Sequence, residues 1–174
     1  TIARIIAISD TVKNTLIASG YPPDGISVVD SCIDQTGLAT LTRDPDFKKA
    51  FGARHLVGGI GKLSAKKNWQ MLIRTAHSLR SRDIAWVLVG DGPEKAKLAR
   101  LVRTLHLTDR VELAGHCDDV APCLQQSRIF VMASRGEGMP YALLEAATCG
   151  VVPVCPRVGS IEDVIATGRN GLLY

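Results

Sequence analysis

The sequence lacks the long apolar runs of membrane-spanning proteins. No window approaches the roughly 20 apolar residues that a transmembrane helix needs, and no basic stretch leads into an apolar one at the N-terminus. Aromatic residues are scarce, at 5% of 174 residues, but hydrophobic residues make up 46%. A chain of this length and composition can bury a sizeable core, so we expect one soluble α/β domain rather than a disordered tail.

The cysteines do not form the patterns of a disulfide framework or a zinc site. Their number is odd and no C-x-x-C pair occurs among them (Cys32, Cys117, Cys123, Cys149 and Cys155). Reduced, mostly buried thiols are typical of a cytoplasmic protein, and this is the location that we expect.

The positive charge is unevenly distributed. Residues 43–82 hold ten Lys or Arg against two acids, a balance of +8, whereas the rest of the chain carries −4 of the net +4. Such a stretch favours an anionic ligand. Nucleic acid is excluded because no aromatic residues are interleaved for base stacking and no nucleic-acid module is recognisable. A small phosphorylated ligand fits better.

Short apolar runs alternate with helical patterns along the chain. We expect strands within 4–9, 26–29, 55–61, 84–90, 111–115, 128–134, 151–155 and 171–174. Most are continuous runs, which suit strands covered on both faces. Between them lie helical patterns such as 68–80. The sequence therefore predicts a Rossmann-like, doubly wound, mainly parallel sheet with helices on both faces. The turn-rich stretch 19–25 suggests a division into 1–25 and 26–174.

In such folds ligands bind where strands end and helices begin, and one of these loops resembles a phosphate loop only at first sight. In residues 58–68, Gly61-Lys62 is followed by Leu63, so no Walker motif is present. Ser64 stands where a third dinucleotide-binding glycine would be, which weakens the alternative of a dinucleotide-dependent oxidoreductase. Lys62 and Lys67 remain as cations beside a helix start.

Two glutamates eight positions apart mark the loop and helix "SRGEGMPYALLEAATCG". Glu137 lies in the loop, where neighbouring glycines let a ligand approach the backbone closely, and Glu145 lies in the helix. Pro140 is expected as the first helical residue, since its fixed φ suits that position. The loop's amides would then point toward an anion. The earlier loop "VGDGPE" (89–94) has the chemistry of a turn that starts a helix.

These loops carry a family resemblance. In order, the chain contains "IIAISDTVKNTLIASGYPPDGISVVDSCID", "GGIGKLSAKKNWQMLIRTAHSLR", "LVGDGPEKAKL", "RVELAGH", "EGMPYALLEAATCGVVPV" and "VGSIEDVIATGRNGLLY". Together they resemble the C-terminal, donor-binding domain of a family 4 retaining glycosyltransferase with the GT-B fold. The resemblance implies an enzyme, of the hexosyltransferase type, that makes a polysaccharide or glycolipid from a UDP-, GDP- or ADP-linked sugar.

The resemblance also implies roles for particular residues. Lys62 and Lys67 would neutralise the diphosphate leaving group, Glu137 would contact the transferred sugar, and these three would be the catalytic residues. Glu145 would accept hydrogen bonds from the ribose hydroxyls. The remaining substrate-binding positions would be Gly61, Gly138, Met139, Pro140 and Tyr141 around the diphosphate and His116 and Cys117 at the base. Neither a metal nor a cofactor is implied.

Some positions depart from the family pattern. Lys62 replaces an arginine, Ser31-Cys32 replaces Asn-Gly, and Gly159-Ser160 replaces Gly-Gly. The resemblance further implies that residues 1–25 end an N-terminal acceptor domain that is missing, along with the last C-terminal helices. We therefore expect this chain to bind donor without transferring sugar, with any membrane contact made through the missing domain.

Two alternatives remain. Asp44-Pro45-Asp46 has the spelling of a metal-binding motif in metal-dependent transferases, but it precedes "FKKAFG" instead of following a strand, which favours helix initiation. The chain could also be a non-catalytic nucleotide-sugar-binding module or a degenerate transferase. The intact glutamate pair and both lysines argue against degeneration.

Overall fold

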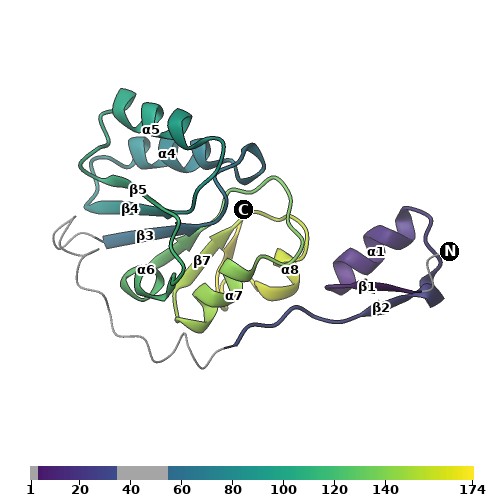
Figure 1. Cartoon of the computed structure of the whole chain (residues 1–174). Coiled ribbons are helices and arrows are strands. Elements are labelled where there is room, and N and C mark those ends of the chain that lie inside the picture. The colour runs from purple at the N-terminus through teal and green to yellow at the C-terminus, as the bar shows by residue number, and fades with distance from the viewer. Residues whose placement is uncertain (1–3, 35–54) are drawn as a thin grey trace.

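The computed structural model describes residues 4–34 and 55–174, which form two sheets (Figure 1). The smaller sheet pairs β1 (Ile5–Ala7) with β2 (Ile26–Val28) in parallel. Helix α1 (Asp10–Ala18) and the short 3-10 helix η1 (Pro23–Gly25) connect these strands. We call residues 4–34 the N-terminal unit. The division expected after residue 25 falls directly before β2, which pairs with β1 and not with the larger sheet.

The larger sheet has six strands in the order β5-β4-β3-β6-β7-β8, and every pairing is parallel. The strands are β3 (His55–Ile60), β4 (Ile84–Val89), β5 (Val111–Gly115), β6 (Ile129–Val131), β7 (Val152–Cys155) and β8 (Leu172–Leu173). Each lies inside a run that the sequence predicts as a strand. The helices are η2 (Ala65–Lys67), α4 (Trp69–Ser78), α5 (Lys95–Thr104), α6 (Ala121–Gln126), α7 (Tyr141–Thr148) and α8 (Ile161–Val164). The predicted Rossmann-like fold class is confirmed.

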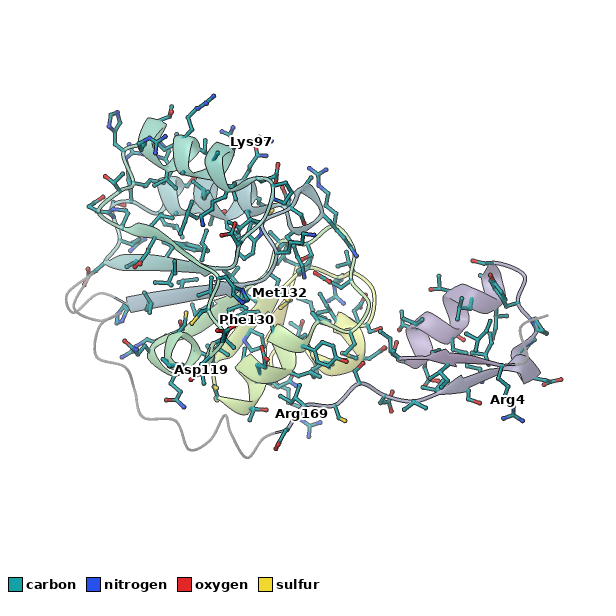
Figure 2. All side chains as sticks on the ribbon, viewed as in Figure 1. Arg4, Lys97, Asp119, Phe130, Met132 and Arg169 are labelled. Carbon is teal, nitrogen blue, oxygen red and sulfur yellow. The ribbon has the colours of Figure 1, made fainter. Side chains whose placement is uncertain are left out.

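Helices cover both faces of this sheet, with α4 and α5 on one side and α6 and α7 on the other (Figure 1). This explains the continuous apolar runs, since a strand covered twice buries both rows of side chains. Five of the six residues of β4 are buried. Figure 2 shows Phe130 and Met132 in the middle of the domain, where they are buried, while Lys97 lies on the outer surface of α5.

The strand order reverses between β3 and β6. From β3 the chain builds outward through β4 and β5, and it then returns to start the other half of the sheet at β6. The loops that follow these two strands therefore begin side by side at the carboxyl edge. This is the topological switch point, where open α/β sheets bind ligands.

Helix α7 begins one residue later than expected. Tyr141 is its first residue, and Pro140 precedes it with φ −77° and ψ 111°. The extended ψ keeps Pro140 outside the helix, where it acts as the residue before the first turn. Among residues 4–34 and 55–174, no helix is long and apolar enough to cross a membrane.

Candidate functional site

The loops at the carboxyl edge of the six-stranded sheet form a connected rim. Leu63 N donates to the Asp91 carbonyl (2.9 Å), and Gly90 N donates to the Gly115 carbonyl (2.6 Å). Gly90 has φ +145°, and a Cβ there would overlap the Gly61 carbonyl, so only glycine allows this approach. We call residues 61–68, 90–94, 115–119, 132–140 and 156–160 the carboxyl rim.

Two of the predicted catalytic residues meet at the switch point. Lys67, at the end of η2, donates from Nζ to Glu137 Oε1 at 2.5 Å. The Glu137 side chain is only 8% exposed and that of Lys67 is 21% exposed. Arg135 N also donates to the Lys66 carbonyl (2.9 Å), which ties the two loops together through their backbones. A nearly buried carboxylate with one lysine as its partner therefore lies where the loops after β3 and β6 meet.

Lys62 lies on the same loop as Lys67 but differs from it in exposure and pairing. Its side chain is exposed, and it makes no ion pair with an acid in the described parts of the chain. Its carbonyl accepts from Trp69 Nε1 (2.9 Å), and this bond anchors the loop to the first residue of α4. Gly61 lies beside Lys67, since a Cβ at Gly61 would be 3.5 Å from Lys67 Cε. The loop thus presents Lys67, which is paired, and Lys62, which has no ion pair among the described residues, on the same rim.

The start of α7 lies next to this pair. Gly138 and Met139 are half-buried, Pro140 is buried, and Tyr141 is 56% exposed. The Gly138 carbonyl accepts from Ser160 N (3.2 Å), so the loop leading into α7 rests on the loop before α8. The first amides of α7 have no partner within the helix, and they carry the partial positive charge of a helix N-terminus.

Glu145 lies in the second turn of α7 and is half-buried. Burial raises the pKa of its carboxyl above the ordinary value, because removal from water disfavours the charged form. Within the portions that the structure describes, its carboxylate makes no hydrogen bond or ion pair. Leu143 and Ala146 hold the opposite face of α7 in the core. The oxygens of the Glu145 carboxylate can therefore accept hydrogen bonds from a ligand without giving up a partner among the described residues.

The predicted base-binding residues lie two strands away from β3, after β5. His116 is exposed, and its Nε2 lies 3.1 Å from Asp118 Oδ1. Cys117 Sγ donates to the Asp119 carbonyl (2.8 Å). No described contact joins either residue to the Lys67 and Glu137 pair. The rim connects them through the 90–94 loop, where Gly90 N bonds to the Gly115 carbonyl and the Asp91 carbonyl accepts from Leu63 N.

Sequence reasoning missed two features of the rim. Asp91 accepts from Gly92 N (2.7 Å) and from Lys95 Nζ (2.6 Å), and the bond to Lys95 is the largest cause of the lowered pKa of its carboxyl. The spacing of Asp91 and Lys95, four residues apart at a helix start, was a usable signal. The second feature is the hydrogen bond from Ser160 N to the Gly138 carbonyl. The presence of serine where the family pattern has glycine did not by itself reveal this bond.

A metal site is not assembled in the described residues, where no three His, Cys, Asp or Glu side chains form a cluster that could hold an ion. The Asp44-Pro45-Asp46 sequence lies outside those residues.

A family model described as "Glycosyl transferases group 1" matches residues 54–174. The chain belongs to this family. It is 43% identical over 174 residues to N-acetyl-alpha-D-glucosaminyl L-malate synthase of Bacillus anthracis, a match that covers 97% of this chain and 45% of the relative. It is 31% identical over 167 residues to a component of human phosphatidylinositol N-acetylglucosaminyltransferase, covering 93% of this chain and 33% of the relative. The chain thus spans less than half the length of these glycosyltransferase relatives.

Solved structures share the fold. The Anabaena protein Alr3699/HepE in complex with UDP-glucose has a TM-score of 0.89 at 21% identity, covering 99% of this chain and 50% of that one. The lipopolysaccharide outer core galactosyltransferase WaaB in its apo form has a TM-score of 0.77 at 25% identity, covering 99% and 48%. The arrangement of six parallel strands with helices around them is therefore that of a glycosyltransferase domain.

Proposed function

We propose that this chain binds a UDP-linked sugar at the carboxyl rim and that, as part of a retaining glycosyltransferase, it presents the sugar for transfer to an acceptor. The observation that carries the proposal is the Lys67 and Glu137 ion pair at the switch point. It places a cation for a phosphate and a carboxylate for sugar hydroxyls within 2.5 Å of each other. That spacing suits a ligand in which a phosphate is bonded directly to a sugar.

The electrostatics of the rim suit a diphosphate leaving group. During transfer the bond between the anomeric carbon and the β-phosphate oxygen breaks, and the electron pair stays on that oxygen. Lys62, Lys67 and the first amides of α7 would neutralise the charge that develops there. Lys67 would then exchange part of its contact with Glu137 for the diphosphate. Glu137 would in turn become free to accept from a sugar hydroxyl.

Glu145 would hold the nucleoside. Its unused acceptor oxygens suit the two hydroxyls of a ribose, because a carboxylate can accept from both at once. Its place in the second turn of α7 would leave the helix N-terminus for the diphosphate. The rim residues after β5, among them His116 and Cys117, would line the base pocket.

The names of related proteins support UDP as the nucleotide and N-acetylglucosamine as the sugar. Several structural neighbours were solved with UDP or a UDP-sugar, and both curated relatives described above are named for N-acetylglucosaminyl transfer or linkage. Their names point to different acceptors, L-malate in one and phosphatidylinositol in the other. The acceptor, retention of configuration, a role in glycolipid synthesis and a cytoplasmic location remain predictions.

Calorimetry with UDP, GDP, ADP and UDP-N-acetylglucosamine tests the proposal, each with and without EDTA. We expect UDP and its sugar conjugate to bind more tightly than GDP or ADP. EDTA should leave the affinities unchanged, because lysines and a helix terminus supply the positive charge. Loss of UDP binding in EDTA would contradict the roles given to Lys62 and Lys67.

A further inference from the structure

The N-terminal unit touches the larger domain beside the Glu137 loop. We call this contact the seam, and it consists of Ile8, Ser9 and Thr11 on one side and Gly138, Ser160 and Asp163 on the other. Ser9 Oγ lies 2.5 Å from Ser160 Oγ, and Thr11 Oγ1 donates to Asp163 Oδ1 at 2.8 Å. A Cβ at Gly138 would lie 3.0 Å from Ile8 Cδ1. In Figure 1, α8 is the helix that faces the N-terminal unit across this seam.

The hydroxyl of Ser160 depends on the seam. Ser160 is fully buried and Ser9 is 2% exposed. Among the described residues, Ser9 is the hydrogen-bond partner of the Ser160 hydroxyl, and Ser9 Oγ also accepts from Val12 N (3.2 Å) as the N-cap of α1. A buried hydroxyl without a partner is costly. Separation of the N-terminal unit would therefore deprive Ser160 of its bond unless water replaced Ser9.

Ser160 is joined in turn to the backbone that carries Glu137. Its N–H donates to the Gly138 carbonyl at 3.2 Å. The preceding residue, Gly159, has φ +57°, and a Cβ there would overlap the Glu137 carbonyl oxygen. Gly159 thus packs against the Glu137 carbonyl and Ser160 bonds to the Gly138 carbonyl, so both residues contact the backbone of the Glu137 loop. A continuous set of contacts therefore runs from Ser9 through Ser160 to the backbone of residues 137–138, and the side chain of Glu137 in turn pairs with Lys67.

We propose that Ser160 is a positioning residue that couples the N-terminal unit to the sugar-binding loop. When Ser9 holds Ser160, the backbone of Glu137 and Gly138 is fixed in the geometry that receives the sugar. The inference rests on the proposed function and extends it. Affinity for the sugar part of the donor depends on the seam, because Gly159 and Ser160 contact the backbone of Glu137 and Gly138. Affinity for UDP depends on the seam less, because Lys62 and Glu145 would bind UDP from outside it.

The first test compares UDP and UDP-N-acetylglucosamine binding in the Ser160→Ala variant of the 174-residue chain. Loss of one hydrogen bond should weaken the sugar conjugate about threefold to tenfold, with UDP changed less than about twofold. Ser127→Ala is the matched control, because Ser127 is also buried and its Oγ donates to the Cys123 carbonyl (2.8 Å) away from the seam. That control should leave the ratio of the two affinities unchanged.

A second test measures the coupling in the opposite direction, as the effect of the ligand on the seam. It replaces Ser9 and Ser160 together and so does not depend on the Ser160→Ala variant. In the Ser9→Cys/Ser160→Cys double variant, disulfide formation across the seam is measured by mass spectrometry of the cross-linked peptides in a fixed thiol buffer. If the seam strengthens sugar binding, the sugar must favour the seam by the same factor. UDP-N-acetylglucosamine should therefore raise the cross-linked fraction above the level that UDP produces.

The outcomes separate the two proposals. If the wild-type chain binds neither ligand, the proposed function fails and this inference fails with it. If the wild-type chain binds both ligands, an unchanged affinity ratio in Ser160→Ala or equal cross-linking with UDP and its sugar conjugate overturns the inference alone. A melting curve of each variant shows whether it is folded. If Ser160→Ala does not fold, cross-linking in the Ser9→Cys/Ser160→Cys variant decides whether the seam and sugar binding are coupled.

Discussion

The two glutamates of the candidate site lie in contrasting surroundings. Glu137, in the loop after β6, is 8% exposed and forms an ion pair with Lys67. Glu145, in α7, is half-buried, yet its carboxylate has no hydrogen bond or ion pair within residues 4–34 and 55–174. The more buried carboxylate has its countercharge inside the protein, and the less buried one has none.

The contrast shows that residues 137–145 offer a ligand two kinds of carboxylate, one already paired with a lysine and one unpaired among the described residues. A buried carboxylate needs a partner in the unliganded protein, and Lys67 fills this role until a phosphate competes for it. A half-buried carboxylate can remain unpaired at a moderate cost, which is visible as the raised pKa of Glu145. An ion pair can be exchanged for charge on a ligand, and an unpaired acceptor is ready for neutral hydroxyls.

The largest effect should follow from removal of one partner of the ion pair. Lys67→Ala leaves Glu137 nearly buried without its cation, which should lower the free energy of unfolding by about 3 kcal/mol, measured by urea denaturation. Lys62→Ala is the matched control, since Lys62 has no described ion pair, and it should change stability by about 0.5 kcal/mol or less. Equal losses in the two variants would remove the distinction between the lysines.

Binding should separate the glutamates next. Glu145→Ala should weaken UDP and UDP-N-acetylglucosamine alike, by about tenfold or more, since a hydrogen bond to a charged group contributes about 1.5 to 3 kcal/mol. Glu137→Ala should weaken only the sugar conjugate and leave UDP affinity nearly intact. Calorimetry on both variants gives the four affinities. A similar loss of UDP binding in both would show that the division of labour is wrong.

A smaller effect should appear in the pH dependence of binding. The pKa of Glu145 is raised, so its charge is lost at a higher pH than that of an ordinary glutamate. Affinity for UDP-N-acetylglucosamine, whose esterified phosphates stay ionised, should fall as pH decreases through that pKa. Glu145→Gln should show a weaker affinity and no such fall. Identical pH profiles would exclude Glu145 from contact with the donor.

The smallest effect concerns stability at neutral pH. Because the folded-state pKa of Glu145 is raised, the folded protein binds its proton more tightly than the unfolded chain, and stability falls as pH rises through that window. The cost is therefore fully present at about pH 7. Glu145→Gln should raise the melting temperature slightly at about pH 7 and not below about pH 4, where the carboxyl is protonated in both states. A lower melting temperature at neutral pH would indicate that Glu145 has a stabilising partner.

Much of the fold could be predicted from local patterns. Continuous apolar runs predicted the eight strands found in residues 4–34 and 55–174, because each is short and most are covered on both faces. Helical spacing predicted α4. The start of α7 was misplaced by one residue, since proline suits both the first helical position and the one before it. The pairing of β2 with β1 rather than with the larger sheet was less accessible, because it is a long-range choice.

For the site, the sequence by itself determined which side chains carry charge and where along the chain they stand. Lys62, Lys67 and Glu137 follow apolar runs, which put them at strand ends, and Glu145 lies in the helical pattern that comes next. The tertiary structure alone decided their partners. Lys67 and Glu137 are 70 residues apart and meet because β3 and β6 are neighbours, and Ser9 and Ser160 are 151 apart and meet across the seam. Side-chain chemistry is a local property, whereas contact between distant segments depends on the order in which strands pack, and no short pattern encodes that order.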